Sequence, residues 1–338
     1  MKAAVCTGVG EIEIRDVPKP EPGPGEVLVR VKSAGVCGSD VDGYRGKHPM
    51  IGFPVILGHE CSGEIAETGE GVDPGRVGEA VTVEPFFTCG ECAFCEQGTY
   101  NFCSNLKIIG HQVDGAFAEY VLIPSKFAHF KPENVSFDEA AILEPCSGSL
   151  HAVRRCNIQS GDFVTVIGCG TMGSFTVQHC RNLGAEVLVI EPAAFKRELA
   201  RELGAAHVLG AADGEKAAYV AEKTGGKMSD VVIEAVGEPE TLFETVGLVK
   251  NGGVIMLIGW TGRDSDAFDL TNTTFKELTV LGTLGFCRDF PVSMQLLSQG
   301  KIDIERIISH RFGLEEVKEA IELLERGDDN VLKAVVNV

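Results

Sequence analysis

The feature of this sequence that most constrains its fold is the alternation of short apolar runs with helix-length segments between residues 162 and 281. Each run is rich in Val, Ile and Leu and lacks the polar alternation of a strand that faces water on one side. The runs predict strands at 162–167, 186–190, 207–209, 230–235, 254–258 and 278–281. Because helix-length segments separate these strands, the pattern indicates a parallel, doubly wound α/β sheet.

The residues before about 137 follow a different pattern, with many glycines and prolines and no regular alternation of strand with helix. Residues 27–32 alternate apolar and polar side chains, as a half-buried strand does. The preceding PKPEPGPGE is a loop, because its prolines remove ladder donors. Further short strands are expected at 61–66, 80–83, 117–123 and 128–131. We therefore expect an antiparallel, barrel-like, β-rich domain.

The remaining segments set the expected domain limits. Residues 137–156 predict helical segments broken at Pro145 and Gly148, and the tail predicts helices at 290–297 and 314–326. Because the tail shows no further strand–helix unit, we expect it to return to the first domain. The expected domains are 1–147, which includes a lobe at 88–104, then 148–284, and the return segment 285–338.

Four cysteines lie close together in the turn-rich loop 88–103. Cys89, Cys92, Cys95 and Cys103 are spaced C-x2-C-x2-C-x7-C, and four thiolates on one short segment can surround a zinc ion. An iron–sulfur cluster is the main alternative, although the late fourth cysteine fits it less well. A disulfide knot is the other alternative, and it needs an oxidising compartment. Four protein ligands leave no open position, so this zinc is expected to be structural.

A glycine-rich stretch after the strand at 162–167 indicates a dinucleotide site. Its GxGxxG pattern lies between a predicted strand and a predicted helix, so a pyrophosphate can approach the backbone at the helix N-terminus. Glu191 ends the next strand, where a carboxylate can hold the ribose hydroxyls of NAD and repel the 2′-phosphate of NADP. NAD is therefore the expected cofactor. The residues expected to bind it are Gly168, Gly170, Thr171, Met172, Gly173 and Glu191.

A second set of potential metal ligands is spread over the first domain. Cys37 follows the strand at 27–32, His59 and Glu60 lie in LGHE, and Glu144 lies in LEP. Each alone is explained as an ordinary buried thiol, a histidine at a strand end or a carboxylate. Together they offer one sulfur, one nitrogen and two carboxylates, which suits a catalytic zinc with one position open to substrate.

The charge and the apolar content exclude several partners. The formal net charge of −19 at pH 7 disfavours nucleic acid and anionic membrane surfaces, which attract basic proteins. The N-terminal residues lack the apolar region of a signal peptide, and no apolar run approaches the roughly 20 residues that span a bilayer. Twelve cysteines without an export signal indicate the reducing cytoplasm. We expect a cytoplasmic protein that acts on a small molecule.

The chain resembles the zinc-dependent medium-chain alcohol dehydrogenase superfamily, in particular its sorbitol (polyol) and threonine dehydrogenase branch. The matching stretches run in the family's order through the whole chain: AGVCGSD, PVILGHECSGEI, CGECAFCEQGTYNFC, DGAFAEYVLIP, AAILEPCSGSLHAV, VIGCGTMG, DVVIEAVG and GLEEVKEAIELL. The resemblance implies a GroES-like catalytic domain and a Rossmann domain, with the active site between them. It also implies a homodimer or homotetramer.

The same resemblance implies the reaction and the roles of individual residues. A secondary alcohol, such as a polyol or sugar derivative, would be oxidised to a ketone by hydride transfer from a zinc-bound alkoxide to NAD. Cys37, His59 and Glu144 would bind or closely flank this zinc, and Glu60 would be a ligand or a nearby carboxylate able to become one. Ser39 would accept the substrate proton. The four-cysteine lobe would hold a second, structural zinc.

Two positions bear on the substrate. Glu144 stands where relatives similar to liver alcohol dehydrogenase carry a second cysteine, and a harder oxygen ligand favours hydroxyl-rich substrates. Gly285 stands where sorbitol dehydrogenases tend to carry arginine, which argues against sorbitol itself. L-threonine or another secondary alcohol is the alternative substrate. Outside enzymes, the alternative is a non-catalytic NAD-binding protein.

Asp42 stands where many relatives carry a histidine that passes the proton to solvent. An aspartate is normally ionised near neutral pH and is a poor proton carrier there, so we expect the proton to leave through Ser39 and the cofactor ribose or water. Asp42→Asn should therefore change kcat only slightly near neutral pH, measured as the rate of NADH formation. A loss of roughly a hundredfold, the usual contribution of a general base, would show instead that Asp42 carries the proton.

Overall fold

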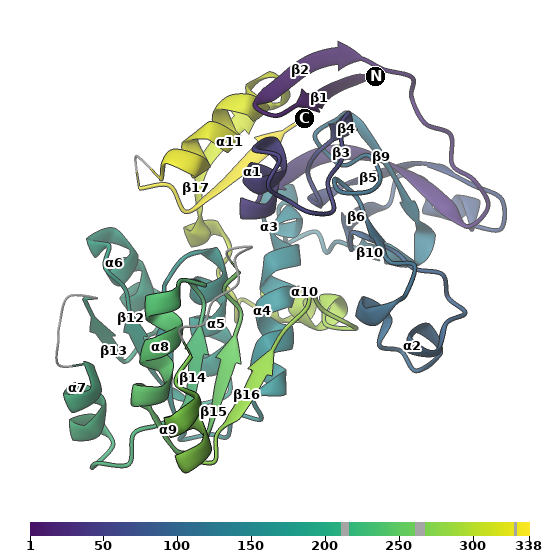
Figure 1. The fold of residues 1–338 in the computed structure, drawn as a ribbon. Helices are drawn as coiled ribbons and strands as arrows, with labels where there is room; N and C mark the ends of the chain where they lie inside the picture. The colour runs from purple at the N-terminus through teal and green to yellow at the C-terminus, as the bar shows by residue number, and fades with distance from the viewer. Residues whose placement is uncertain (211–215, 261–267, 328–329) are drawn as a thin grey trace. The chain divides into compact units, whose positions relative to one another are not determined.

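The computed structural model describes residues 1–210, 216–260, 268–327 and 330–338, and the chain divides into two compact units (Figure 1). Unit 1 comprises Met1–Glu144, Phe290–Gly300 and Ile304–Val338, and unit 2 comprises Pro145–Asp289 and Lys301–Asp303. Unit 1 is therefore discontinuous in sequence. The domain limits proposed from the sequence lie close to these unit limits and stay predictions.

Unit 2 is built on a six-stranded parallel sheet with the order β13-β12-β11-β14-β15-β16. The order reverses at β11, and the carboxyl end of such a strand is where doubly wound sheets bind nucleotides. The strands are β11 (Phe163–Ile167), β12 (Glu186–Ile190), β13 (His207–Leu209), β14 (Ser229–Glu234), β15 (Val249–Leu257) and β16 (Thr279–Gly282). The helices between them are α5 (Thr171–Asn182), α6 (Ala194–Glu202), α7 (Lys216–Lys223), α8 (Pro239–Leu248) and α9 (Leu270–Phe275).

Apolar side chains on both faces of this sheet are covered by helices. Val164 of β11 belongs to a core that includes Val177 of α5, whereas Ile167 of the same strand belongs to a second core that includes Val220 of α7. Successive side chains of a strand point to opposite faces, so a strand covered on both faces needs no polar positions. The predicted doubly wound α/β sheet is confirmed.

Unit 1 is β-rich and mainly antiparallel. Its largest sheet has the order β10-β6-β5-β3-β18-β17, with β9 also paired to β3, and smaller sheets join β2-β1-β4 and β7-β8. The predicted antiparallel domain is confirmed, although β1 and β2 were not predicted. The strands are β1 (Lys2–Gly8), β2 (Glu11–Asp16), β3 (Glu26–Val36), β4 (Val55–Ile56), β5 (Glu60–Thr68), β6 (Ala80–Val83), β7 (Phe86–Phe87), β8 (Lys107–Ile108), β9 (Tyr120–Pro124), β10 (Ala128–Phe130), β17 (Ile308–Gly313) and β18 (Lys333–Asn337).

The tail contains the two predicted helices, α10 (Phe290–Ser298) and α11 (Val317–Arg326), and also a strand–helix–strand unit. β17 and β18 run parallel, and α11 connects them. The prediction that the tail has no further strand–helix unit is therefore wrong. β17 gave a weak signal because it lies at the sheet edge and only Ile308 is fully buried along it. β18 places this unit in the sheet by pairing with β3.

The helical region after residue 136 is interrupted at one place only. It forms α3 (Phe137–Ala141) and α4 (Leu143–Arg155), so the predicted breaks at Pro145 and Gly148 are wrong. Pro145 is the third residue of α4, where a backbone N–H has no partner within the helix and its absence costs little. None of the helices in the described ranges is long and apolar enough to cross a membrane.

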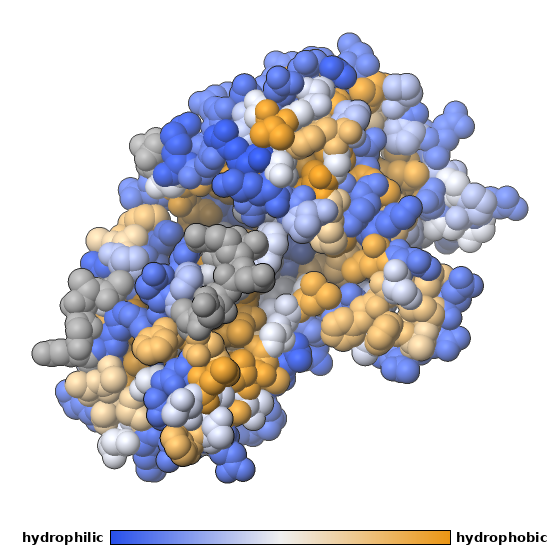
Figure 2. Space-filling model, in the orientation of Figure 1, coloured by the Kyte–Doolittle hydropathy of each residue, from blue (hydrophilic) through white to orange (hydrophobic). Residues whose placement is uncertain are grey.

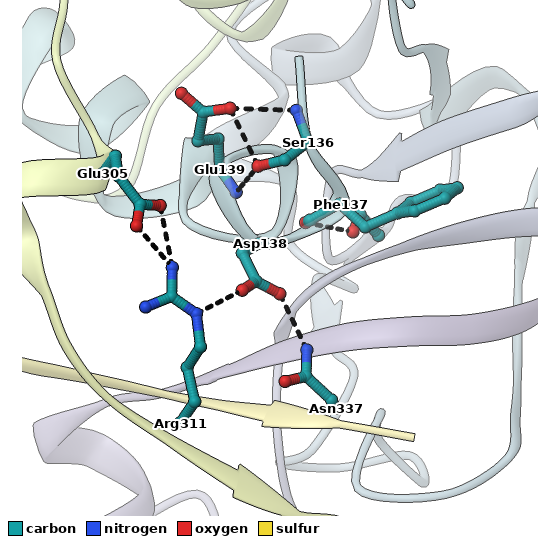
Figure 3. Close-up of polar contacts among 8 residues, drawn as sticks. Ser136, Phe137, Asp138, Glu139, Glu305, Arg311 and Asn337 are labelled. Carbon is teal, nitrogen blue, oxygen red and sulfur yellow. Dashed lines mark hydrogen bonds and ion pairs between the residues drawn. The ribbon is translucent and has the colours of Figure 1, made fainter.

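A polar network joins α3 to the returning tail (Figure 3). Ser136 caps the helix, because its Oγ accepts a hydrogen bond from the backbone N–H of Glu139 at 3.1 Å. Asp138 Oδ2 accepts from Arg311 Nε on β17 at 2.8 Å, and its Oδ1 accepts from Asn337 Nδ2 on β18 at 2.7 Å. One carboxylate therefore holds both strands of the tail against the helix that leads to Glu144.

Candidate functional site

The four cysteines of the lobe converge on one point. The Sγ atoms of Cys89, Cys92, Cys95 and Cys103 all lie within 4.8 Å of one another. The Sγ of Cys89 is 3.5 Å from that of Cys103 and 3.9 Å from that of Cys95. The lobe achieves this with the short helix α2 (Ala93–Glu96), which begins directly after Cys92 and contains Cys95.

These distances fit a single zinc ion. A tetrahedron with Zn–S bonds of ~2.3 Å has S···S edges of ~3.8 Å. A disulfide needs ~2.05 Å between its sulfurs, and all four cysteines are free in the structure. Backbone N–H groups of Cys95 and Ser104 lower the pKa of Cys92 to about 6, whereas burial raises the pKa of Cys95 to about 12.

A second group of potential ligands forms in unit 1 from residues far apart in the sequence. Cys37 lies between β3 and α1 (Gly38–Tyr44), His59 directly precedes β5, and Glu60 begins it. The sulfur, one ring nitrogen and one carboxylate oxygen lie within 4.8 Å of one another. One sulfur, one nitrogen and one oxygen form the kind of three-ligand set that a catalytic zinc uses.

Space for Glu60 is created by a glycine on the neighbouring strand. Gly35 of β3 pairs with Glu60 of β5, so the Glu60 side chain lies over a residue without a side chain. A Cβ atom on Gly35 would lie 2.1 Å from Glu60 Oε2 and 2.6 Å from Ile142 Cδ1. Glu60 Oε2 is buried and has no hydrogen-bond partner in the protein, which leaves it available to a cation.

Glu144 lies near this group but is not one of its three close members. Its side chain is half-buried at the beginning of α4. Burial raises the pKa of Glu144 to about 7; the neighbouring Glu60 also raises it, while His59 opposes the rise. The structure therefore brings Cys37, His59 and Glu60 together, and the part of Glu144 in metal binding stays a prediction.

Asp40 is a residue of this site that the sequence reasoning missed. It is fully buried, its Oδ2 accepts from the backbone N–H of Cys37 at 2.8 Å, and its Oδ1 accepts from that of Gly58 at 3.0 Å. The same Oδ1 lies 3.7 Å from His59 Nδ1, which is too far for a hydrogen bond but close enough for attraction between opposite charges. Burial lowers the pKa of His59, but the charges of Asp40 and Cys37 outweigh burial and hold it well above its usual value. An acidic residue three positions after Cys37, at a helix start, was the available signal.

Lys333 is the second residue that the sequence reasoning missed. It lies on β18 with only 2% of its surface exposed, and its Nζ donates to Glu60 Oε1 at 2.5 Å. Burial lowers the pKa of Lys333, but the charges of Glu60 and Cys37 outweigh that effect and leave it raised. The ammonium holds one Glu60 oxygen while the other stays free. No sequence motif signals this pair, because 272 residues separate its members.

Ser39 and Asp42 both lie on α1, in the turn that follows Cys37. Ser39 Oγ is buried and has no hydrogen-bond partner in the protein, so it can accept a proton or hydrogen bond from a ligand. The backbone carbonyl of Asp42 accepts from Lys47 and His48. The proton-accepting role of Ser39 stays a prediction.

The glycine-rich loop of unit 2 borders a cavity of about 430 Å³ at the carboxyl end of β11. Gly168 has a φ of +88°, which favours glycine, and a Cβ on Gly173 would lie 2.1 Å from Gly168 O. Gly173 therefore lets α5 pack closely on the loop. Gly168, Gly170 and Glu191 line the cavity, whereas Thr171, Met172 and Gly173 form the first turn of α5 beside it.

Glu191 has a structural role as well as a place in this cavity. Its Oε2 accepts from the backbone N–H of Cys169 and its Oε1 from that of Ala193, both at 2.8 Å. Each carboxylate oxygen has a second lone pair that can accept from a ribose hydroxyl. Lys196 lines the same cavity and provides a positive charge near Glu191.

Two family models match the chain. The model described as the alcohol dehydrogenase GroES-like domain matches residues 23–133, and the model described as zinc-binding dehydrogenase matches residues 171–299. The first range contains Cys37, His59, Glu60 and the cysteine lobe, and the second contains most of the unit 2 sheet.

Relatives and solved structures match over nearly the whole chain. Sorbitol dehydrogenase of Bacillus subtilis is 31% identical over 99% of this chain and 97% of its own length, and L-threonine 3-dehydrogenase of Pyrococcus abyssi is 35% identical over 97% and 95%. A protein described as a zinc-binding dehydrogenase from Sinorhizobium meliloti, bound to NADP, has a TM-score of 0.93 and 35% identity. The match covers 100% of this chain and 99% of that one. An alcohol dehydrogenase of Escherichia coli CFT073, complexed with NADH, has a TM-score of 0.94 and 32% identity over 100% and 99%.

Replacing Cys95 with serine should remove zinc from the lobe, because one of four sulfur donors is lost. We expect about one zinc fewer per chain, a lower melting temperature and less soluble protein, measured by elemental analysis and thermal unfolding. Cys287→Ser, at a half-exposed cysteine outside both ligand groups, should leave the metal content unchanged. Native-like, fully zinc-loaded Cys95→Ser protein that has lost only hydride transfer would contradict a structural role for the lobe.

Replacing Lys333 with methionine should leave a buried carboxylate, Glu60, without its cation. Breaking a buried pair in this way costs about 3–5 kcal/mol, and the loss should shrink when zinc is bound because a second cation then faces Glu60. The matched control is Lys32→Met, because Lys32 pairs with Glu64 at 3.3 Å between the neighbouring strands but is partly exposed. That control should cost less than about 1 kcal/mol in denaturant unfolding. Equal losses in the two variants would count against the role given to Lys333.

Proposed function

Because the chain belongs to the zinc-dependent medium-chain alcohol dehydrogenase superfamily, we propose that it oxidises a secondary alcohol of the polyol or sugar-derivative class to a ketone, with NAD as hydride acceptor. The observation that carries this proposal is the S, N, O ligand group of Cys37, His59 and Glu60, which accompanies a separate four-sulfur lobe. A site with four protein ligands has no position left for substrate, as in a structural zinc site. A site with three protein ligands keeps one position open, as in a catalytic zinc site.

The proposed mechanism assigns a task to each group around the alcohol. A zinc ion held by Cys37, His59 and a carboxylate would lower the pKa of the alcohol as a Lewis acid. Ser39 accepts the hydroxyl proton and passes it on toward solvent. NAD bound in the cavity beside the glycine-rich loop would supply the hydride acceptor, so the alcohol would yield a ketone, NADH and one proton.

NAD is proposed over NADP because of Glu191. Its carboxylate lines the cavity beside the glycine-rich loop, where it would attract ribose hydroxyls and repel a 2′-phosphate. Lys196 in the same cavity weakens this repulsion, and the solved relatives include one with NADP and one with NADH. The proposed preference is therefore for NAD, with NADP as a poorer cofactor.

A homodimer or homotetramer is proposed from one edge of the unit 2 sheet. β16 ends the sheet order, and large apolar side chains are exposed on and beside it: Leu270, Phe275, Val280 and Leu284. Figure 2 shows apolar side chains gathered in the region of β16 and α9. An exposed apolar edge strand can pair with its own copy about a twofold axis. A monomeric mass in solution would contradict this.

A location in the cytoplasm is proposed from the cysteines. All twelve are free in the structure, including the four cysteines of the lobe, whose thiols lie close enough together to be oxidised in an oxidising compartment. Zinc binding by the lobe likewise requires reduced thiols.

A substrate panel tests the proposed function. Zinc-loaded enzyme with NAD should oxidise polyols or sugar phosphates with a kcat/KM at least about tenfold above that for L-threonine, measured by NADH absorbance. The threonine alternative is favoured by a specific relative, the Pyrococcus abyssi enzyme, and a reversed preference would establish it. NAD binding without oxidation of any alcohol, and with zinc confined to the cysteine lobe, would show a non-catalytic protein instead.

A further inference from the structure

His111 is a buried histidine whose two ring nitrogens have no hydrogen-bond partner in the protein. The side chain is 6% exposed and lies in the loop between β8 and β9. An unpaired buried polar group costs about 1–3 kcal/mol, so an apolar ring of the same shape would make this unit more stable. A histidine kept at this cost calls for a group that completes its hydrogen bonds.

The His111 ring lies beside the proposed metal ligands. Its centroid is 5.1 Å from that of His59, with an angle of 64° between the rings. The centroid of the His48 ring is 4.6 Å from that of His111. The Nδ1 of His48 accepts a hydrogen bond from the backbone N–H of Met50 at 3.3 Å. A small molecule held at the metal by way of His59 is therefore within reach of His111.

Backbone contacts hold the His111 loop against the chain that carries His59. The N–H of Ala116 donates to Gly58 O at 2.8 Å. A Cβ on Gly115 would lie 2.3 Å from the same oxygen, so the two segments meet backbone to backbone. The position of His111 relative to His59 is thus set by the fold, as specific recognition of a substrate group requires.

The chemistry of the ring selects the kind of group. Both ring nitrogens of His111 are buried without a partner in the protein, so both are available to one ligand group. A neutral imidazole presents one N–H donor and one acceptor nitrogen. A hydroxyl can accept from the ring N–H and donate to the other ring nitrogen. An alkyl group can do neither, and an ammonium can only donate.

We propose that His111 is a specificity-determining residue that binds the hydroxyl on the carbon next to the reacting carbinol, and that the preferred substrates are vicinal diols. The inference rests on the proposed function, because it places the reacting alcohol at the metal beside His59. It also separates the two substrate classes, since a polyol carries a hydroxyl on the adjacent carbon and threonine carries an ammonium there.

Two alcohols that differ by one hydroxyl test the inference. The wild-type enzyme, loaded with zinc and NAD, should have a higher kcat/KM for a stereoisomer of butane-2,3-diol than for butan-2-ol. His111→Phe should lower the value for the diol by about 5- to 150-fold, the equivalent of one lost hydrogen bond, and leave the value for butan-2-ol unchanged. His111→Asn, which keeps a donor and an acceptor, should restore part of the preference.

Thermal unfolding provides a readout that does not depend on turnover. His111→Phe should melt at the same temperature as the wild type or higher, because it removes unpaired polar atoms, and the diol should raise its melting temperature less than it raises that of the wild type. The matched control is His129→Phe in the same unit. His129 Nε2 is 2.7 Å from the buried carboxylate of Glu84, so this variant should melt lower yet keep the diol preference.

The outcomes distinguish the inference from the function on which it rests. Equal losses for both alcohols in His111→Phe, or a lower melting temperature with an unchanged preference, would overturn the inference and assign the ring to a buried water. The proposed function would stand in both cases. Failure of the wild type to oxidise any alcohol would overturn the proposed function, and the inference with it.

Discussion

The candidate catalytic site depends on one buried carboxylate. Asp40 accepts hydrogen bonds from the backbone of Cys37 and of Gly58, and thereby joins the two segments that present the sulfur and the imidazole. Burial raises the pKa of Asp40, but the charge of His59 and the Cys37 N–H outweigh burial and keep it below its usual value. The carboxylate is therefore ionised, and its charge attracts the His59 ring, whose Nδ1 lies 3.7 Å from Asp40 Oδ1.

Charge balance explains why these groups tolerate one another. Asp40 and Glu60 are buried acids, and Cys37 adds a further negative charge when it is ionised as a ligand. Lys333 pairs with Glu60, and without a metal the raised pKa of His59 places a second positive charge beside Asp40. A divalent cation bound to neutral His59 would take the place of that proton and, together with Lys333, balance the charges of Asp40, Glu60 and an ionised Cys37. Burial, and after it the charge of Glu60, raises the pKa of Glu144 to about 7.

Patterns confined to one segment of chain could be read from the sequence, and contacts between distant segments could not. The unit 2 strands and the cysteine lobe were predicted because periodicity and spacing are local properties. Lys333 and His111 were missed because their roles arise from β18 pairing with β3 and from two loops meeting at Gly58. The break at Pro145 was wrong because a proline's effect depends on its position in the helix. The resemblance supplied Cys37, His59, Glu60 and Glu144 as a set, since their spacing alone did not bring them together.

The discontinuity of unit 1 determines when its ligand site can be completed during synthesis. β3 is made early, but the strand that pairs with its second half, β18, follows nearly three hundred residues later, after all the strands of unit 2. Until then β3 has an open edge and Glu60 lacks the ammonium of Lys333. Domains generally fold as they emerge, so unit 2 can form while unit 1 still waits for its last strand. During synthesis, an incomplete chain can therefore already have a folded unit 2 while the ligand site of unit 1 is still incomplete. The capacity to bind a nucleotide would arise before the capacity to bind the metal.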